Sequence, residues 1–199
     1  MAKRKWWLLT LCLGLLVPLA VGGTLAYFTD EEKAENVFTV GNVDITLTEP
    51  SWQDAQSAYP GEVLDKDPRV TNTGRNPCFV RLSVANLDQF VRAYGTQAMI
   101  GLRFRGEAGY NTADWVLAAD GCYYYFSGGS GVLESGEVTE AVFDQVVMPT
   151  ALTNDAKTLP IVVTAQAVQA QGARPAWEDV SAMTVEEIAA WFAQTFPAE

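Results

Sequence analysis

Residues 78–84 read Cys-Phe-Val-Arg-Leu-Ser-Val, so a small or apolar side chain stands at every second position. Side chains of a β-strand point alternately to its two faces, and this stretch therefore predicts a strand with one buried face. That face would carry Cys78, Val80, Leu82 and Val84. Residues 43–48 alternate in the same way, with Val43, Ile45 and Leu47 on the expected inner face.

Further strand-like stretches, each bounded by turn residues, follow along the chain. Residues 72–77 are rich in Asn, Gly and Pro and are predicted to form a hairpin between a strand at 69–71 and the strand described above. Asp120-Gly121 favours a hairpin turn and predicts a second hairpin between 115–117 and 122–126. The other expected elements are strands at 137–147 and 159–168, a flexible glycine-rich loop at 128–131, and a short helix or irregular insertion at 88–99.

The C-terminal segment has helical periodicity. Thr184 and Glu187 occupy the two positions of a capping box, in which each side chain satisfies a backbone N–H near the start of a helix. An apolar stripe at helical spacing predicts a helix over 185–195. We therefore expect an all-β protein, an antiparallel β-sandwich with a C-terminal helix packed on it. The stripe consists of Val185, Ile188, Ala189 and Phe192.

The first 26 residues form a predicted export signal. Three basic residues precede an apolar run from Trp6 to Val21, and a helix of this length is short for the roughly 30 Å hydrocarbon core of a membrane. The small residues Thr24 and Ala26 place a cleavage site between Ala26 and Tyr27. The alternative is a retained N-terminal anchor, and the uncleaved segment is the only contact with a membrane that we expect.

Charge and residue types argue against several functions. The chain has 24 acidic and 13 basic residues, and loss of residues 1–26 removes three basic and no acidic residues, which leaves a formal charge of −14. Such a surface repels nucleic acid, so no nucleic-acid partner is expected. The chain contains no histidine, which zincins and Ser/His/Asp hydrolases require. We therefore predict no catalytic, cofactor-binding or metal-binding residues.

A few residues leave alternatives open. Asp65 and Asp67 carry oxygens that suit Ca²⁺, but a charged turn before a strand explains them better. The tyrosines at 123–125 alternate across a strand, and packing is favoured over an exposed ligand platform. Cys78 and Cys122 could form a disulfide in an exported protein, worth about 4 kcal/mol, or remain two small buried residues that never meet.

The N-terminal sequence resembles that of a known family. Residues 22–30 read Gly-Gly-Thr-Leu-Ala-Tyr-Phe-Thr-Asp, and after an acidic spacer residues 38–47 read Phe-Thr-Val-Gly-Asn-Val-Asp-Ile-Thr-Leu. This pattern resembles secreted proteins of the TasA/camelysin (CalY) type. The resemblance implies export by a Gram-positive bacterium, processing by a signal peptidase of the SipW class, and a jelly-roll-like sandwich. Looser similarity continues at 67–74, 79–84 and 161–170.

The resemblance also implies a mode of assembly. In TasA-like fibres the N-terminal segment of one subunit completes the sheet of its neighbour through backbone hydrogen bonds. The matching segment here is 27–40, whose apolar members include Val37, Phe38 and Val40. A flexible leader, or a strand that pairs within its own subunit, remains the alternative. The expected organisation is a signal peptide at 1–26, this candidate donor strand at 27–40, a β-sandwich at 41–176 and a helical segment at 177–199.

The leading hypothesis is a secreted structural protein, extracellular or on the cell surface. It would be a fibre subunit of a biofilm matrix, without catalysis, and would associate with itself or with another matrix protein. The alternative is a surface adhesin or a module that binds carbohydrate or protein through loops at one end of the sandwich. A secreted hydrolase that uses paired carboxylates is the weakest alternative.

Cleavage after Ala26 can be tested on the exported protein. We expect the mature chain to begin at Tyr27, because Thr24 and Ala26 are the small residues that follow the apolar run. Mass spectrometry of the N-terminus measures this directly. A mature chain that begins beyond Val40, or that retains residues 6–21, would contradict the prediction.

Overall fold

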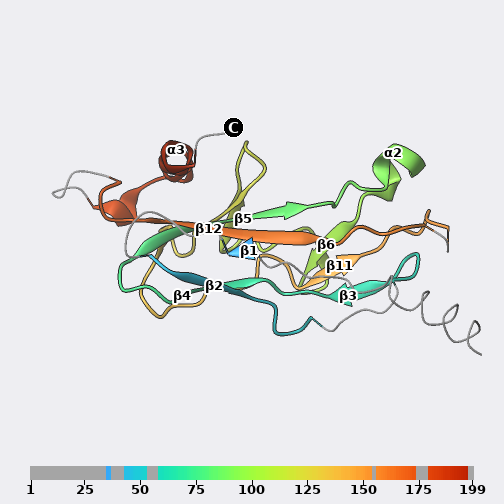
Figure 1. Cartoon of the computed structure of the whole chain (residues 1–199), viewed down its shortest axis with the longest axis horizontal. Coiled ribbons are helices and arrows are strands. Elements are labelled where there is room, and N and C mark those ends of the chain that lie inside the picture. The colour runs from blue at the N-terminus through green and yellow to red at the C-terminus, as the bar shows by residue number, and fades with distance from the viewer. Residues whose placement is uncertain (1–34, 37–42, 53–57, 154–155, 174–178, 197–199) are drawn as a thin grey trace, which may run out of the picture. The chain divides into compact units, whose positions relative to one another are not determined.

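The computed structural model describes residues 35–36, 43–52, 58–153, 156–173 and 179–196 (Figure 1). The chain divides into two compact units, 1–31 and 32–199, and every described residue belongs to the second. Several predictions fall outside the described residues. These are the signal peptide, the cleavage site at Ala26 and Tyr27, and the apolar residues Val37, Phe38 and Val40.

The first sheet is built on two eight-residue strands. β5 (Cys78–Ala85) and β12 (Val162–Gln169) pair antiparallel over their whole length, from Val162 opposite Ala85 to Gln169 opposite Cys78. Both strands were predicted from sequence: β5 has nearly the predicted bounds, and β12 begins three residues later than the predicted start at 159. The sheet runs in the order β1-β12-β5-β9-β8, with β10 also paired to β5. The shorter strands are β1 (Glu35–Asn36), β8 (Trp115–Leu117), β9 (Tyr123–Tyr125) and β10 (Val132–Leu133).

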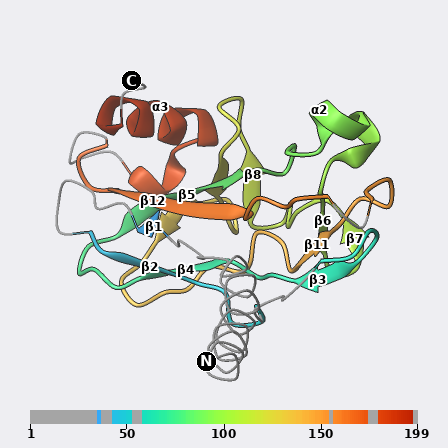
Figure 2. The ribbon, with the colours of Figure 1, turned by 45° about the vertical axis from the view of Figure 1, so that its right-hand side comes forward.

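A second layer of strands lies against the first sheet (Figures 1 and 2). One part has the order β3-β11-β6-β7, and the other is the pair β2-β4. The backbone of 136–139 adds beside β4, because Asn72 N–H donates to Glu137 O and Thr139 N–H donates to Val70 O. The strands are β2 (Ile45–Thr48), β3 (Val63–Asp65), β4 (Arg69–Asn72), β6 (Gly101–Phe104), β7 (Glu107–Ala108) and β11 (Gln145–Val147).

The main core fills the space between the two layers. Val80 and Leu82 of β5 are almost fully buried there with Ala165 of β12, and Ile45 and Val70 contribute from the second layer. Residue 43 and the alternate residues of β2 are buried as the sequence predicted. The arrangement is therefore a mostly antiparallel, sandwich-like all-β fold, as expected from the alternating apolar pattern.

The opposite face of the first sheet is covered by helix α3 (Val185–Thr195). Its bounds are those predicted from sequence, and both hydrogen bonds of the capping box form between Thr184 and Glu187. Ile188 and Phe192 pack on Phe79 and on residues of β9 and β12. A Cβ at Gly131 would lie only 2.5 Å from Cδ1 of Ile188, so any larger residue there would displace the end of this buried side chain. Shorter helical turns are α2 (Val91–Tyr94), η2 (Thr96–Ala98) and η3 (Val180–Ala182), the first two within the undecided 88–99 segment.

The predicted hairpin at 72–77 is wrong. β4 pairs with β2, whereas β5 pairs with β12, β9 and β10, so this segment carries the chain from one layer to the other. The buried Asn72 side chain fixes the crossing because its amide donates to Asn76 O at 2.9 Å and Leu133 O at 3.0 Å. A turn signal identifies a change of direction but not the strand that will be the partner.

Two other expectations are refined by the structure. Residues 128–131 lie in a tight turn in which Ser127 and Ser130 bond to each other's backbone and Gly128 and Gly129 have φ of 60° and 88°. The strand predicted at 137–147 is regular only at β11. The hairpin across Asp120-Gly121 is confirmed, with β8 and β9 as its antiparallel strands.

Phe192 tests how strongly α3 is attached to the sheet. Replacement of this fully buried ring by alanine removes its edge contact with Tyr124, whose ring centroid lies 5.5 Å away. We expect Phe192→Ala to lower the free energy of unfolding by about 3 kcal/mol. The exposed Gln194→Ala on the same helix is the control and should change it by less than about 0.5 kcal/mol. Urea unfolding measures both, and equal losses would show that α3 packs loosely.

Candidate functional site: the outer edge of strand β12

The first sheet has an edge at β12 that accepts a strand. β1 pairs parallel with this edge, with Glu35 opposite Thr164 and Asn36 opposite Ala165. On the other side of β12, Ala170 N–H donates to Pro77 O at 3.0 Å, so the even-numbered residues bond toward β5. Backbone groups alternate in direction along a strand, and the odd-numbered residues 163–169 therefore face the outer edge. Among the described residues, only β1 pairs with that edge.

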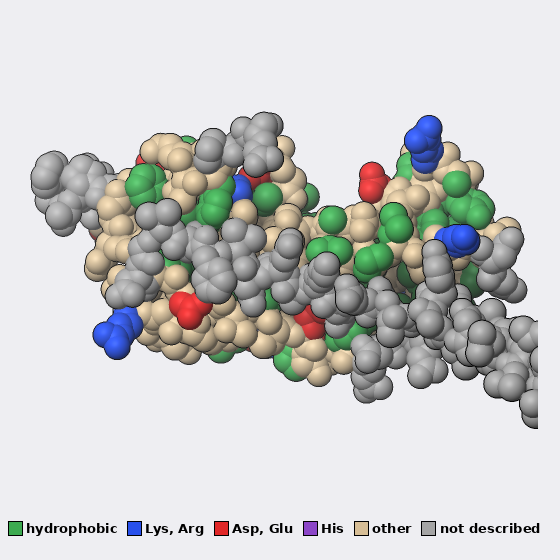
Figure 3. Space-filling model, in the orientation of Figure 1, with side chains coloured by type: hydrophobic (Ala, Val, Ile, Leu, Met, Phe, Trp, Pro, Cys, Tyr) green, Lys and Arg blue, Asp and Glu red, His purple; other side chains and the backbone are tan. Residues whose placement is uncertain are grey.

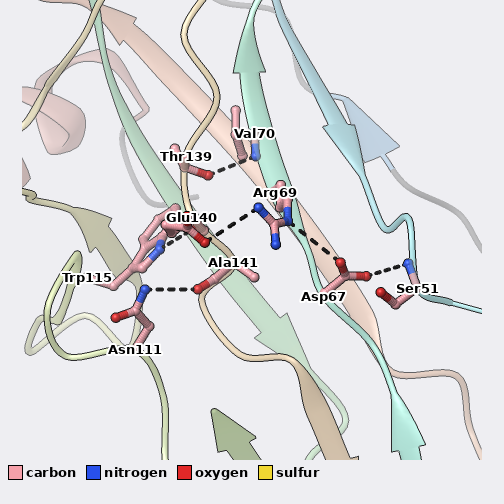
Figure 4. A network of polar contacts seen from close by, with 9 residues as sticks. All are labelled: Ser51, Asp67, Arg69, Val70, Asn111, Trp115, Thr139, Glu140 and Ala141. Atoms are coloured by element: carbon pink, nitrogen blue, oxygen red, sulfur yellow. Dashed lines mark hydrogen bonds and ion pairs between the residues drawn. The ribbon is translucent and has the colours of Figure 1, made fainter. Parts of the chain in front are cut away.

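The opposite edge of the same sheet, at β8, is closed. Its outward Trp115 N–H donates to Asn111 O at 3.0 Å, and its outward Leu117 N–H donates to the Tyr110 hydroxyl at 3.2 Å. Asn111 is itself buried and donates from its side chain to Ala141 O (Figure 4). Donors that are already bonded cannot recruit a further strand, so β12 and β8 differ in what they can bind.

Helix α3 reaches the end of the β12 edge. The indole Nε1–H of Trp191 donates to Gln169 O at 3.2 Å, and Gln169 is the last residue of β12. The Gln169 carbonyl faces away from β5, because the odd-numbered residues of β12 face the outer edge. The helix therefore contacts the far end of the edge that β1 uses near its beginning.

Arg81 ties α3 to the sheet beneath it. It projects from β5 between Val80 and Leu82, on the face that α3 covers, and its Nε donates to Gln166 Oε1 of β12 at 2.8 Å. Its Nη1 donates to the Asp120 carboxylate at 3.2 Å and to the Tyr124 hydroxyl at 3.1 Å. The guanidinium also stacks over the Phe192 ring, 4.8 Å from the centroid. One side chain thus joins β12, the β8–β9 hairpin and the helix.

The groups around Arg81 have shifted pKa values. Burial raises the pKa of Asp120, but hydrogen bonds from Tyr124 and Cys122 and the charge of Arg81 outweigh burial, so the net pKa is lowered. Burial and the hydrogen bond to Asp120 raise the pKa of Tyr124 to about 12. Burial also raises the pKa of the Cys122 thiol. At neutral pH Arg81 and Asp120 therefore form an ion pair beside a neutral tyrosine and a neutral thiol. Such a cluster can hold α3 on the sheet, but it contains no activated nucleophile.

Of the two alternatives left open for Cys78 and Cys122, a disulfide or two separate thiols, the structure has two free thiols. Cys78 is buried in the core between the layers, whereas Cys122 packs with the cluster beneath α3, on the other face of the first sheet. Burial, followed by the charge of Glu134, raises the pKa of Cys78 to about 12. Alternate placement across a sheet keeps the two sulfurs apart, and the sequence alone left this open.

The acidic residues considered as calcium ligands serve the second layer. Asp67 is buried and accepts from Ser51 N–H at 2.7 Å, and its other oxygen lies 3.6 Å from Nε of Arg69 (Figure 4). Arg69 in turn contacts Glu140 at 3.5 Å. Asp65 accepts a bond from Gln145 on the neighbouring strand. The two carboxylates therefore hold strands and a loop together, consistent with a charged turn.

The surface offers scattered apolar side chains. Figure 3 shows such side chains on one face, separated by polar atoms and isolated charged groups. Tyr124, the middle tyrosine of 123–125, is fully buried beneath α3, so these tyrosines are packed as favoured from sequence. Isolated exposed apolar residues are normal at protein surfaces. The large exposed ones in the described part are Tyr59, Val63, Met99, Val116, Leu117, Val138 and Leu159.

Sequence reasoning missed the residues that shape the β12 edge. Trp191 was not singled out because it lies beside the apolar stripe of α3, and Gln166 looked like an ordinary exposed strand residue. Arg81 carried a usable signal: it stands on the face opposite Val80 and Leu82, and a predicted helix must cover one face of the sandwich. Tyr110 gave no sign that its hydroxyl would close the β8 edge.

Comparison with known proteins bears on the N-terminal part of the chain. Residues 4–79 match the model of a family described as camelysin metallo-endopeptidase. The chain is a TasA/camelysin-like protein. Proteins of this family are in general secreted proteins of the Gram-positive surface or matrix. No curated protein and no solved structure matches the chain. The family match ends within β5, so β12 and α3 lie beyond it.

The family description names a metallopeptidase, but this chain has no histidine. Within the described ranges no three Cys, Asp or Glu side chains are grouped to hold a metal ion. The described residues therefore do not bring together the ligands from which zinc sites are usually built. Searched over the same ranges, no helix is long and apolar enough to span a bilayer.

Asp120 makes the attachment of α3 sensitive to acid. The pKa of Asp120 in the folded protein lies below the ordinary value of an aspartate, so its contribution to stability is present above that ordinary value and is lost as the pH falls through the lowered pKa. We expect Asp120→Asn to destabilise the protein at about pH 6 by less than about 1 kcal/mol, because solvent screens this partly exposed carboxylate. Urea unfolding should show the difference from wild type shrinking toward about pH 2. A difference that stays constant with pH would contradict the assignment.

Proposed function

We propose that this camelysin-like chain is a non-catalytic structural protein of the Gram-positive cell surface or extracellular matrix that assembles by strand addition. The observation that supports the proposal is the parallel pairing of β1 with the outer edge of β12. β1 comes from the N-terminal segment, and β12 forms part of the sandwich. The same pairing could be made with the β12 edge of a second copy.

The two edges of the first sheet support an assembly with direction. β8 has its outward donors bonded within the subunit, whereas β12 receives a strand. A donor segment at one place and an acceptor edge at another make a head-to-tail contact, and such contacts generate open chains when the rotation between subunits does not close a ring. Backbone hydrogen bonds would supply much of the affinity.

The apolar residues of the N-terminal segment would complete the added strand. We propose that Val37, Phe38 and Val40 continue along β12 after Asn36, and that release from a signal peptidase of the SipW class frees the segment. The mature charge of −14 would keep subunits soluble until a specific pairing forms. Partners are further copies of the chain or another matrix protein.

Removal of the donor segment tests this function. We expect the intact mature chain from Tyr27 to form polymers whose mass grows with concentration, and a chain that lacks residues 27–40 to remain monomeric. Sedimentation and electron microscopy measure assembly, and thermal unfolding shows whether the shortened sandwich is folded. A synthetic peptide of residues 27–42 should bind the shortened chain, because it restores the missing strand.

A matched control separates assembly from folding. Thr46→Ala on the exposed face of β2 should leave both polymer formation and the peptide affinity unchanged. If the shortened chain is destabilised while the intact chain stays monomeric at every concentration, the segment pairs within its own subunit. That outcome would remove the support for fibres and favour the adhesin reading.

A further inference from the structure

We propose that the outer face of the β3-β11-β6 sheet pairs with the same face of a second copy of the chain. This contact is separate from the β12 edge, so it goes beyond strand addition and does not depend on it. The three strands are neighbours in the second layer (Figure 2). The outer face consists of Val63, Asp65, Gly101, Arg103, Gln145 and Val147.

The alternation of side chains places these residues on the side of the sheet that points away from the core. Leu64, Leu102 and Val146, which pair across the three strands, lie in the main core or pack against it. Their neighbours along each strand therefore point outward. Val63 is 40% exposed and Asp65 is also exposed, in agreement with this assignment. The face is thus the solvent side of a sheet whose other side is covered.

One row across the outer face carries opposite charges at its two ends. Asp65 and Arg103 both pair with Gln145, so they stand on either side of it. Because neighbouring strands lie roughly 4.8 Å apart, the backbones of the two charged residues are roughly 10 Å apart. Asp65 accepts from the Gln145 amide at 3.1 Å, whereas none of the ion pairs among the described residues uses Arg103. The guanidinium can therefore pair with a carboxylate of another molecule.

The adjacent row has a branched side chain at one end and none at the other. Val63 and Gly101 both pair with Val147 and stand on either side of it. A Cβ at Gly101 would lie 3.5 Å from the Cβ of Val147, which is an ordinary contact, so the subunit itself has room for a larger residue. Glycine leaves the outer face without a side chain at this point.

A twofold axis along β11 makes both rows complementary to themselves. Such an axis, lying between two facing sheets, places β3 of one copy over β6 of the other and each row over itself. Asp65 then faces Arg103 of the second copy, and Val63 faces the second copy's Gly101, with each contact made twice. Facing sheets pack with their strands nearly aligned and with interdigitating side chains, so the valine enters the space that glycine leaves. The charges and the side-chain sizes thus favour the same arrangement.

The size of the face predicts a weak dimer. A standard interface uses about 20–30 residues on each side, and this face offers far fewer. The mature formal charge of −14 also makes two copies repel each other at long range. We therefore expect a dissociation constant between about 10 μM and 1 mM.

Charge reversal at one position at a time tests the paired face. Asp65→Arg places arginine opposite arginine, and Arg103→Asp places aspartate opposite aspartate, so each variant alone should pair at least about tenfold more weakly than wild type. An equimolar mixture of the two variants should pair again, because both charged contacts then join an arginine to an aspartate. Sedimentation equilibrium of the mature chain from Tyr27, up to about 1 mM, measures the affinity.

Two further variants control for net charge and for side-chain size. Arg92→Asp on α2 changes the net charge as Arg103→Asp does, and it should pair like wild type because this exposed residue lies outside the face. Gly101→Val should weaken pairing, because it fills the space opposite Val63 while keeping an ordinary contact with Val147 of its own subunit. Thermal unfolding shows whether each variant is folded.

The outcomes separate this inference from the proposed function. Dimers that follow the charge pattern, in protein that never forms longer assemblies, would support the paired face and refute strand addition. Polymers that electron microscopy shows to be one subunit wide in wild type and in every variant would support strand addition and overturn the paired face. Polymers two subunits wide in wild type and in the mixture, but one subunit wide in each single variant, would support both.

Three results would overturn the paired face in protein that does not polymerise. The first is a wild-type chain that stays monomeric up to about 1 mM. The second is a pair of single variants that associate as tightly as wild type. The third is a mixture that associates no more tightly than either variant alone.

Discussion

The antiparallel ladder between β5 and β12 is the interaction on which the other elements depend. Eight residues of each strand pair without interruption, and both faces of the ladder are buried. Val80 and Leu82 contact the core between the layers, and Phe79 contacts the helix on the other side. Each face provides apolar area worth roughly 25 cal/mol per Å² when removed from water. Loss of the ladder would therefore detach the second layer and α3 together.

Hydrogen-bonded and charged side chains fix the arrangement of the other elements, although Glu49 Oε1, Trp52 Nε1 and Asp144 Oδ1 are buried without a hydrogen-bond partner. Asn72 bonds to two carbonyls at the crossing between layers. Lys66, almost fully buried, pairs with Glu49 at 2.7 Å and lies over the Trp52 ring. Such groups cost several kcal/mol if left unpaired in a low-dielectric interior, so they select one arrangement of strands and loops. In this acidic protein the basic side chain of Lys66 joins residues that lie apart in sequence.

The two edges of the first sheet differ in the partners of their outward backbone groups. At β8 the Tyr110 hydroxyl and Asn111 carbonyl use the outward donors. At β12 the outer side pairs with β1 at Thr164 and Ala165, and Trp191 donates to the Gln169 carbonyl at the end of the strand. An unprotected edge recruits strands without discrimination, and the bonded donors of β8 make that edge less able to do so than β12.

The sequence by itself determined the local elements. Alternation placed β2 and β5, a run rich in β-branched residues placed β12, and Asp120-Gly121 placed the β8–β9 hairpin. The Thr184–Glu187 capping box and the apolar stripe after it gave the bounds of α3, because each of these signals depends on neighbouring residues. The residues near the N-terminus also indicated the family. The tertiary structure alone decided which strands pair, why Cys78 and Cys122 stay apart, and that Arg81 and Trp191 join α3 to the first sheet. These depend on contacts between residues distant in sequence, and a periodic pattern shows which face of a strand is apolar but not what will cover it.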